Sequence, residues 1–149
     1  YKQKYEPQQK KDKLIIKCIL HKGTHYDIAK LIHHIYNEKL KCISLHKKQW
    51  VIYNGEKKQW DFLDNESSIR VEIFDYLIRI FENEALKYSN YMNQNNFDLL
   101  YVPIMNDYFD FDSYRCQIIM ELIHRLKSPT HKNHIMKECR ELFYCKNKY

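Results

Sequence analysis

Glycine is scarce in this sequence of 149 residues, which contains only Gly23 and Gly55. A loop that cradles nucleotide phosphates needs several glycines, and the sequence has no G-x-x-x-x-G-K-[ST] or G-x-S-x-G motif. No apolar run approaches the roughly 18 residues of a membrane span, since even residues 15–20 are interrupted by Lys17. We therefore predict that these residues turn over no ATP, need no cofactor and contact no membrane.

Signals of secretion are also missing. The five cysteines are odd in number and widely spaced, and the first residues, YKQKYEPQQKKDK, contain no apolar core. Both features favour reduced thiols in a cytosol-like compartment over a disulfide framework. Because the sequence does not begin with methionine, we expect it to be a piece of a longer polypeptide. Its aromatic fraction of 15% excludes wholesale disorder, and its length suits one domain with a core.

The sign of the charge changes along the chain. Residues 1–60 carry 14 basic and 5 acidic side chains (+9), residues 61–112 carry 3 and 11 (−8), and residues 113–149 carry 8 and 3 (+5). A strongly basic first part favours contact with a polyanion. A solvated lysine-rich surface without a ligand is the alternative, and composition leaves both open.

Hydrophobic spacing predicts two helices near the N-terminus. Residues 1–12 are polar and contain Pro7, so we expect a linker or tail, with a short helix from residue 14. Gly23 is expected to end this helix, and Thr24 to cap the next one. In that second helix the predicted buried residues are Ile28, Leu31, Ile32 and Ile35, and the predicted outward residues are Lys30, His33 and Asn37.

Three strands are predicted next. Residues 40–45, 50–53 and 59–62 have strand-like patterns, and residues 46–48 and Asn54-Gly55 are expected to turn the chain between them. Residues 13–63 therefore read as helix–helix–strand–strand–strand, an order close to a winged helix.

The rest of the chain is predicted to be mostly helical. Residues 64–87 form a long amphipathic helix, residues 88–112 an insertion, and residues 113–149 two closing helices separated at Ser128-Pro129. We therefore predict one α+β domain over residues 13–149, dominated by helices, with a winged-helix-like N-terminal half and additional C-terminal helices.

Two groups of residues resemble metal ligands by type. One is acidic and lies in an aromatic stretch: Asp107, Asp110 and Asp112. The other lies near the C-terminus: His131, His134, Cys139 and Cys145. The first lacks the glycine and terminal glutamate of a calcium loop, and the second lacks the paired short spacings of a structural zinc site. We interpret them as an acidic surface loop, exposed histidines and core cysteines, and predict no metal.

Lysine accounts for 20 of the 25 basic residues, and lysine suits phosphate contact better than base reading. Binding to DNA should therefore be independent of sequence and weaken as salt rises. Protonation of His33 near a pH of roughly 6.5 would add its positive charge to the lysine contacts. Trp50 and Trp60 are predicted to be core residues rather than platforms for bases. The candidate DNA-binding residues are Lys10, Lys11, Lys13, Lys22, Lys30, His33, Lys47, Lys48, Lys57 and Lys58.

One stretch carries a family resemblance. The segment GTHYDIA over residues 23–29, followed by a strand pair with Trp50 and then by Trp60-Asp61, resembles the domain that precedes the superfamily 3 helicase in poxvirus-type primase–helicases. These proteins occur in nucleocytoplasmic large DNA viruses, phages and plasmids. The segment LKSPTHKNHIMKECRELFY over residues 126–144 is similar to the closing helices of that family. The resemblance runs from residue 14 to residue 144, apart from residues 88–112, and carries no catalytic motif.

The resemblance implies a part of a viral DNA-replication protein in the host cytoplasm. An ATP-driven hexameric helicase, which uses ATP and magnesium, would lie downstream, and often a primase upstream. Two functions are compatible with this setting. The first is a non-catalytic module that binds single- or double-stranded DNA for the helicase. The second is a protein–protein interaction collar that joins subunits or links primase to helicase.

Overall fold

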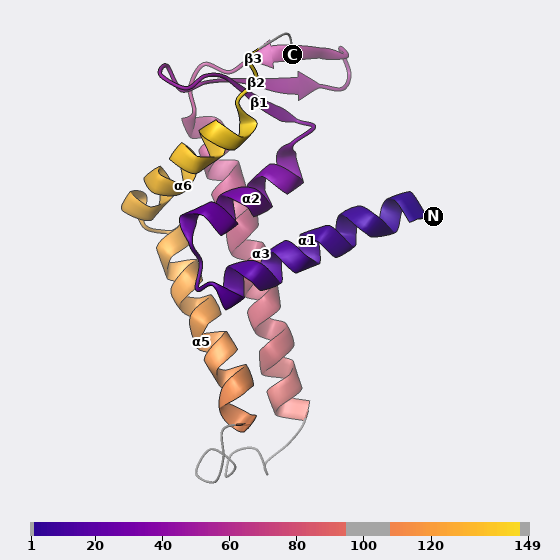
Figure 1. Cartoon of the computed structure of the whole chain (residues 1–149), viewed down its shortest axis with the longest axis vertical. Coiled ribbons are helices and arrows are strands. Elements are labelled where there is room, and N and C mark those ends of the chain that lie inside the picture. Colours follow the sequence, from indigo (N-terminus) through magenta and orange to yellow (C-terminus); the bar gives the residue numbers. More distant parts are fainter. Residues whose placement is uncertain (1, 95–107, 147–149) are drawn as a thin grey trace.

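The computed structural model describes the backbone of residues 2–94 and 108–146, and the side chains of residues 6–88 and 114–146. Within these ranges the order of elements is helix–helix, three strands and further helices, as predicted, and the structure is a helix-dominated α+β fold (Figure 1). The elements are α1 (Lys2–Leu20), α2 (His25–Tyr36), β1 (Leu40–Ser44), β2 (Gln49–Asn54), β3 (Gln59–Phe62), α3 (Ser67–Gln94), α5 (Tyr108–Leu126) and α6 (Pro129–Phe143).

The three strands form an antiparallel sheet in the order β1-β2-β3. In its register Lys41 pairs with Val51, and Val51 pairs with Phe62. Because consecutive strands run in opposite directions, the β1–β2 turn and the β2–β3 turn lie at opposite ends of the sheet, as Figure 1 shows. The C-terminal segment covers part of the β1 edge, where the Cys145 N–H donates to the Cys42 carbonyl over 2.9 Å.

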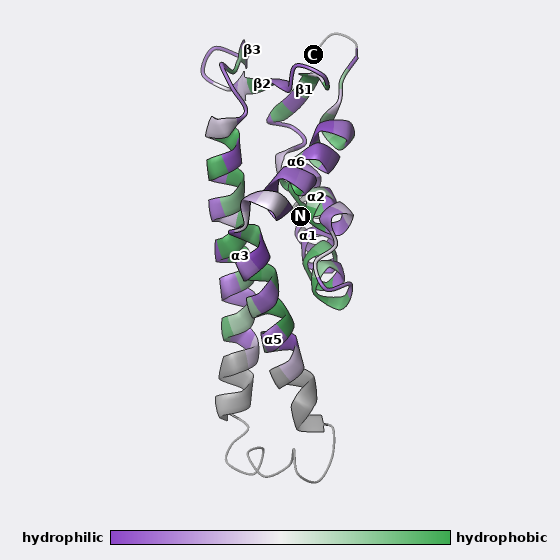
Figure 2. Cartoon of the chain, turned by 90° about the vertical axis from the view of Figure 1, so that its left-hand side faces the viewer, coloured by the Kyte–Doolittle hydropathy of each residue, from purple (hydrophilic) through white to green (hydrophobic). Residues whose placement is uncertain are grey.

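The helices pack around one core below the sheet. The helices α3 and α5 lie side by side as a long antiparallel pair, while α2 packs against both α1 and α6. Figure 2 shows the sheet across one end of α3, with α1, α2 and α6 on one side of the α3–α5 pair. Buried side chains from each of these five helices form the core, among them Cys18, Leu31, Phe74, Leu122 and Met136.

Trp50 joins the sheet to the helices. It is 1% exposed, and its ring centroid lies 5.4 Å from that of Phe143 in α6. Its indole N–H donates to Glu66 over 2.8 Å, and Glu66 also accepts from Arg140 over 2.9 Å. Because a largely buried charge needs a partner, this ion pair fixes β2 against α6 and the start of α3. The prediction that Trp50 is a core residue is confirmed.

Helix α1 is longer than the sequence pattern predicted. Residues 2–12, expected to be a linker or tail, form its first part, although Pro7 lies inside it. Lysine and glutamine are good helix formers, so this stretch is helical without an apolar stripe where neighbours support it. Two contacts support it: the Lys11 amine donates to the Tyr76 hydroxyl over 2.9 Å, and the His34 ring nitrogen lies 3.0 Å from the Pro7 carbonyl.

Helix α2 begins as predicted. Thr24 is its N-cap and accepts from the Asp27 N–H over 3.2 Å, while its hydroxyl donates to the Asp27 carboxylate over 2.7 Å. Burial alone would raise the pKa of Asp27, but hydrogen bonds from Thr24 and His21 outweigh it, so the pKa is lowered. Gly23 stands between the two helices at φ +72°, and its N–H donates to the Cys18 carbonyl over 2.7 Å. Its predicted role as a C-cap is confirmed.

The C-terminal half has the predicted helices with wider bounds. Helix α3 extends to Gln94 and α5 begins at Tyr108, so both ends of the predicted insertion over residues 88–112 belong to these helices. Asp110 and Asp112 therefore lie on α5 rather than in a loop, and Asp107 lies outside the described residues. None of the helices, as far as the structure describes them, is long and apolar enough to cross a membrane.

Candidate nucleic-acid interface

The turn lysines do not form one surface. Lys47 and Lys48 lie in the β1–β2 turn, whereas Lys57 and Lys58 lie in the β2–β3 turn at the opposite end of the sheet. The four lysines lie in turns, as predicted, but in two separate places, because a meander of three strands cannot bring its two turns together.

Both turns are built in the same way. A side chain at the end of the preceding strand accepts backbone N–H groups: Ser44 from Lys47 over 3.1 Å, and Asn54 from Glu56 and Lys57 over 3.0 and 3.2 Å. Each turn then ends on a lysine in the left-handed region, with φ 52° at position 48 and φ 53° at position 58. All four turn lysines are exposed, so their ammonium groups are open to an anion.

The β2–β3 end of the sheet gathers lysines from several segments. Lys39 is exposed, and its carbonyl accepts from the Tyr53 N–H over 2.9 Å, which places it beside the end of β2. The Lys41 ammonium lies 5.8 Å from the centroid of the Trp60 ring on β3. With the exposed pair Lys57 and Lys58 in the adjoining turn, this end presents four lysines.

The outer face of the sheet is aromatic. Since Trp50 points toward the helices, strand alternation turns Val51 and Tyr53 to the other face, together with their register partners. Tyr53 is 41% and Phe62 is 59% exposed. The Trp60 ring is partly exposed and lies 5.3 Å from that of Tyr53. The prediction that Trp60 is a core residue is therefore wrong, because it points away from the helices.

The predicted outward face of α2 is only partly open. Lys30 is half-buried, with its ammonium 4.8 Å from the Tyr26 ring centroid, while Asn37 is exposed. His33 packs with its ring 4.8 Å from that of Phe143. Burial, and then the positive charges of Lys41 and Lys10, lower the pKa of His33, so it is protonated at a lower pH than its sequence alone suggested. The expected inner residues of this helix are found inside: Ile28, Leu31 and Ile32 are buried, and Ile35 is partly buried against the core.

The other predicted contacts are spread along α1 and its end. Lys10 and Lys13 are exposed on the helix, and Lys22 is exposed in the turn to α2 at φ 59°. Lys11 is instead half-buried, because it donates to the Tyr76 hydroxyl. Of these lysines, Lys10 lies near enough to His33 of α2 for its charge to lower the pKa of that histidine.

Three histidines meet where α2 and α6 begin. The His25 ring nitrogen lies 3.1 Å from that of His131, and its ring centroid lies 5.1 Å from that of His134. Burial lowers the pKa of His25, and the neighbouring charges of His134, His131 and Arg125 lower it further. Among the residues with described side chains, no group of three His, Cys, Asp or Glu is placed to hold a metal ion.

Three of the cysteines are core residues. Cys18, Cys42 and Cys139 are fully buried, and burial raises the pKa of all three thiols, that of Cys18 to about 12. A thiol that stays protonated at neutral pH is a poor nucleophile and a poor metal ligand. The prediction of a core position is confirmed for Cys139, whereas Cys145 is only partly buried.

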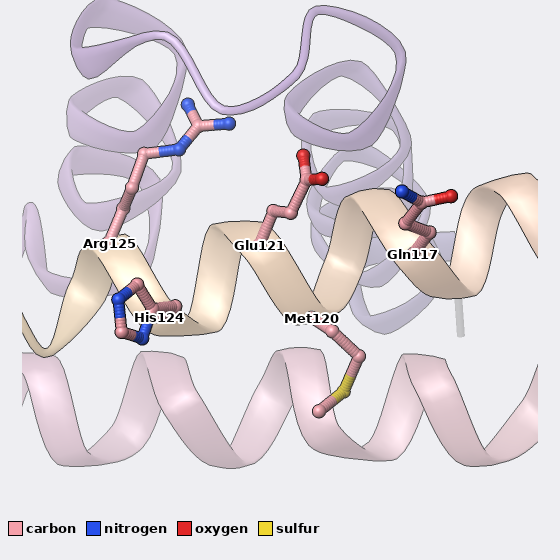
Figure 3. A pocket seen from close by; sticks show the side chains of 5 residues that line it. All are labelled: Gln117, Met120, Glu121, His124 and Arg125. Atoms are coloured by element: carbon pink, nitrogen blue, oxygen red, sulfur yellow. The ribbon is translucent and has the colours of Figure 1, made fainter.

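A groove of about 460 Å³ runs along α5 (Figure 3). All five lining residues come from this helix: Gln117, Met120, Glu121, His124 and Arg125. Figure 3 shows Gln117, Glu121 and Arg125 on one side of the helix and Met120 and His124 on the other, so their polar groups do not converge on one point. Arg125 is already engaged, since it donates to the Lys22 carbonyl over 2.6 Å. The groove has the character of an open helix face.

Two features of this region were not predicted from the sequence. One is the exposed face that carries Tyr53 and Phe62, although the alternation of β2 around the buried Trp50 contained that information. The other is Glu66, because a carboxylate that receives both an indole N–H and an arginine from a distant helix leaves no local pattern. No model of a known protein family matches the chain, and comparison with curated proteins gives no match.

Proposed function

We propose that this domain is a non-catalytic DNA-binding module that contacts phosphates through lysines without reading sequence. The observation that carries this proposal is the group of four lysines at the β2–β3 end of the sheet, Lys39, Lys41, Lys57 and Lys58. They adjoin an exposed aromatic face and outnumber the exposed acids beside them, Glu38 and Glu56. Such an excess of positive charge attracts a polyanion and releases its counterions on binding.

The resemblance to poxvirus-type primase–helicases supplies the setting of the proposal. In that setting the module is winged-helix-like, belongs to a viral replication protein and hands DNA to a downstream ATP-driven helicase. Helix α3, which exposes Glu72, Asp75 and Glu82, would lie away from the contact with DNA. The catalytic chemistry of such a protein would belong to its other domains.

A salt series tests this function. DNA affinity, measured by fluorescence anisotropy with single-stranded and duplex oligonucleotides of unrelated sequence, should be similar for all sequences of one strand type. With four or more lysine–phosphate contacts, it should fall on the order of 100-fold between about 50 and 200 mM salt. Replacing Lys47, Lys48, Lys57 and Lys58 together by Glu should abolish binding while the circular dichroism spectrum is kept. Binding that is insensitive to salt, or unchanged by the four reversals, contradicts the proposal.

A protein–protein interaction collar is the second candidate. It is favoured by exposed apolar side chains on the helices: Leu20 is 60%, Val71 62%, Leu86 58% and Met120 58% exposed. Light scattering at rising protein concentration distinguishes the two functions. A collar predicts a mass above that of the monomer in the absence of DNA, and it predicts that Met120→Ser, rather than the lysine reversals, lowers that mass.

A further inference from the structure

The outer face of the sheet combines stacking surfaces with positive charge. Two cross-strand rows lie on it, one formed by Lys41, Val51 and Phe62, the other by Tyr53 and Trp60. Lys41 is on β1 and Trp60 on β3, so an approach of 5.8 Å carries the Lys41 side chain over β2. Val51 beneath it is 0% exposed, although it faces away from the helices. Side chains therefore cover Val51 at the centre of this face, while the rings of Tyr53 and Phe62 remain exposed.

The charges around these rings are mostly positive, since the four lysines at this end of the sheet outnumber the exposed Glu38 and Glu56. None of the five outward positions in the two rows is acidic, because the one acid of β3, Asp61, pairs with Ile52 and is bonded to Asn54 and Gln59. Lys57 and Lys58 lie in the turn that follows Tyr53 and precedes Trp60, and Lys39 lies beside Tyr53. A strand whose bases lay on Tyr53 and Trp60 would have its phosphates within reach of these lysines.

We propose that this outer face stacks the bases of single-stranded DNA, so that the domain prefers unpaired strands to duplex. The inference rests on the proposed DNA-binding function and adds the form of the ligand. In a duplex each base is covered above and below by its neighbours, whereas an unpaired base can lay its face on an aromatic ring. Lysines alone would bind either form of DNA, so the preference comes from the exposed Tyr53 and Phe62 and the partly exposed Trp60.

Substitutions on the face test the inference directly. Anisotropy titrations compare a labelled oligothymidine strand with a duplex of equal length at one salt concentration. Tyr53→Ala and Trp60→Ala should each weaken single-strand binding roughly 5- to 150-fold, the range expected for losing one stacked base. Duplex binding should change less than about twofold. Tyr114→Ala is the matched control and should change neither, because Tyr114 is a tyrosine of similar exposure (48%) on α5.

A second measurement separates stacking from folding. Trp60 is the partly exposed tryptophan and Trp50 the buried one, so stacking should quench the emission of Trp60 as oligothymidine is added. Trp60→Phe keeps a ring at this position and should retain single-strand affinity within about threefold while losing the quench. This result is informative even where Trp60→Ala does not fold.

The outcomes for the two proposals are distinct. No DNA binding of either kind by the wild-type domain contradicts the proposed function, and the stacking inference with it. Equal affinity for both forms, or equal losses for both forms in Tyr53→Ala, leaves the proposed function standing and overturns the stacking inference. A single-strand preference that is lost with the rings and kept in Tyr114→Ala establishes it.

Discussion

Left-handed backbone at lysine is a recurring feature at the scale of single residues. Lys22, Lys48 and Lys58 all have φ between 52° and 59°, a region that costs an ordinary side chain about 1 kcal/mol or more. Glycine would relieve this strain, and the one glycine in a hairpin turn, Gly55, does not occupy such a position. Lysine at the ends of the two hairpin turns therefore places an ammonium group there at the expense of backbone strain.

Gly23 is constrained both by its backbone conformation and by the side chain packed against it. It has φ +72°, and a Cβ there would lie 3.1 Å from the Leu122 side chain, which is fully buried. We therefore expect Gly23→Ala to lower the free energy of unfolding by roughly 2 kcal/mol, as measured by urea denaturation. Gly55→Ala is the control, because a Cβ at that position meets nothing within 4 Å, and its effect should stay within about 0.5 kcal/mol. Equal effects of the two substitutions would show that the turn between α1 and α2 tolerates a side chain.

At the scale of elements, the sequence predicted those with a local signature. The helix α2 has a capping threonine, an acid three residues later and an apolar stripe, and the structure contains all three. The start of α1 was not predictable in this way, because its helical state depends on Tyr76 and His34, which belong to other helices. The same limit applies to the candidate site: lysines can be counted in a sequence, but their division between two ends of a sheet follows from strand topology.

The junction of α2 and α6 should respond to pH. The lowered pKa of His25 means that the folded protein binds a proton there less readily than the unfolded chain, whose imidazole has a pKa of about 6.5. As pH falls through 6.5 toward the folded pKa, the unfolded state gains protons first, so the free energy of unfolding should decrease. The neighbours His131, His134 and Arg125 reinforce this effect, Glu138 opposes it, and the similarly lowered pKa of His33 adds to the decrease.

Urea denaturation of the wild-type domain between about pH 7.5 and 5 measures this dependence. His25→Gln should make the decrease shallower, because one proton-linked group is removed. His46→Gln, at an exposed position in the β1–β2 turn, is the control and should leave the curve parallel to that of the wild type. A His25→Gln curve that runs parallel to that of the wild type would mean that this histidine does not link protonation to folding. Asp27 has a lowered pKa of its own, but it titrates below this range and does not confuse the comparison.

At the scale of the whole molecule, the lysines are distributed over several surfaces. They occupy α1, the turn after it and both ends of the sheet, whereas α3 carries four acidic side chains against three basic ones. The two hairpin turns lie at opposite ends of the sheet, and each contains two lysines. The two lysine pairs therefore have different neighbours. One pair adjoins Lys39, Lys41 and the rings of Tyr53 and Trp60, and the other does not.

This separation gives a comparison in which net charge is held constant. The double substitutions Lys57→Glu/Lys58→Glu and Lys47→Glu/Lys48→Glu change the charge of the domain by the same amount, and all four positions are exposed. If DNA follows the lysine-rich end of the sheet, reversal in the β2–β3 turn should weaken binding on the order of tenfold or more, and reversal in the β1–β2 turn by only a few-fold through the long-range field. Affinities are measured by anisotropy at about 150 mM salt, because a Debye length of about 8 Å screens charges that do not contact the DNA. Equal losses from the two pairs would mean that net charge alone draws DNA to this protein, and a larger loss from the β1–β2 pair would place the interface at the other end of the sheet.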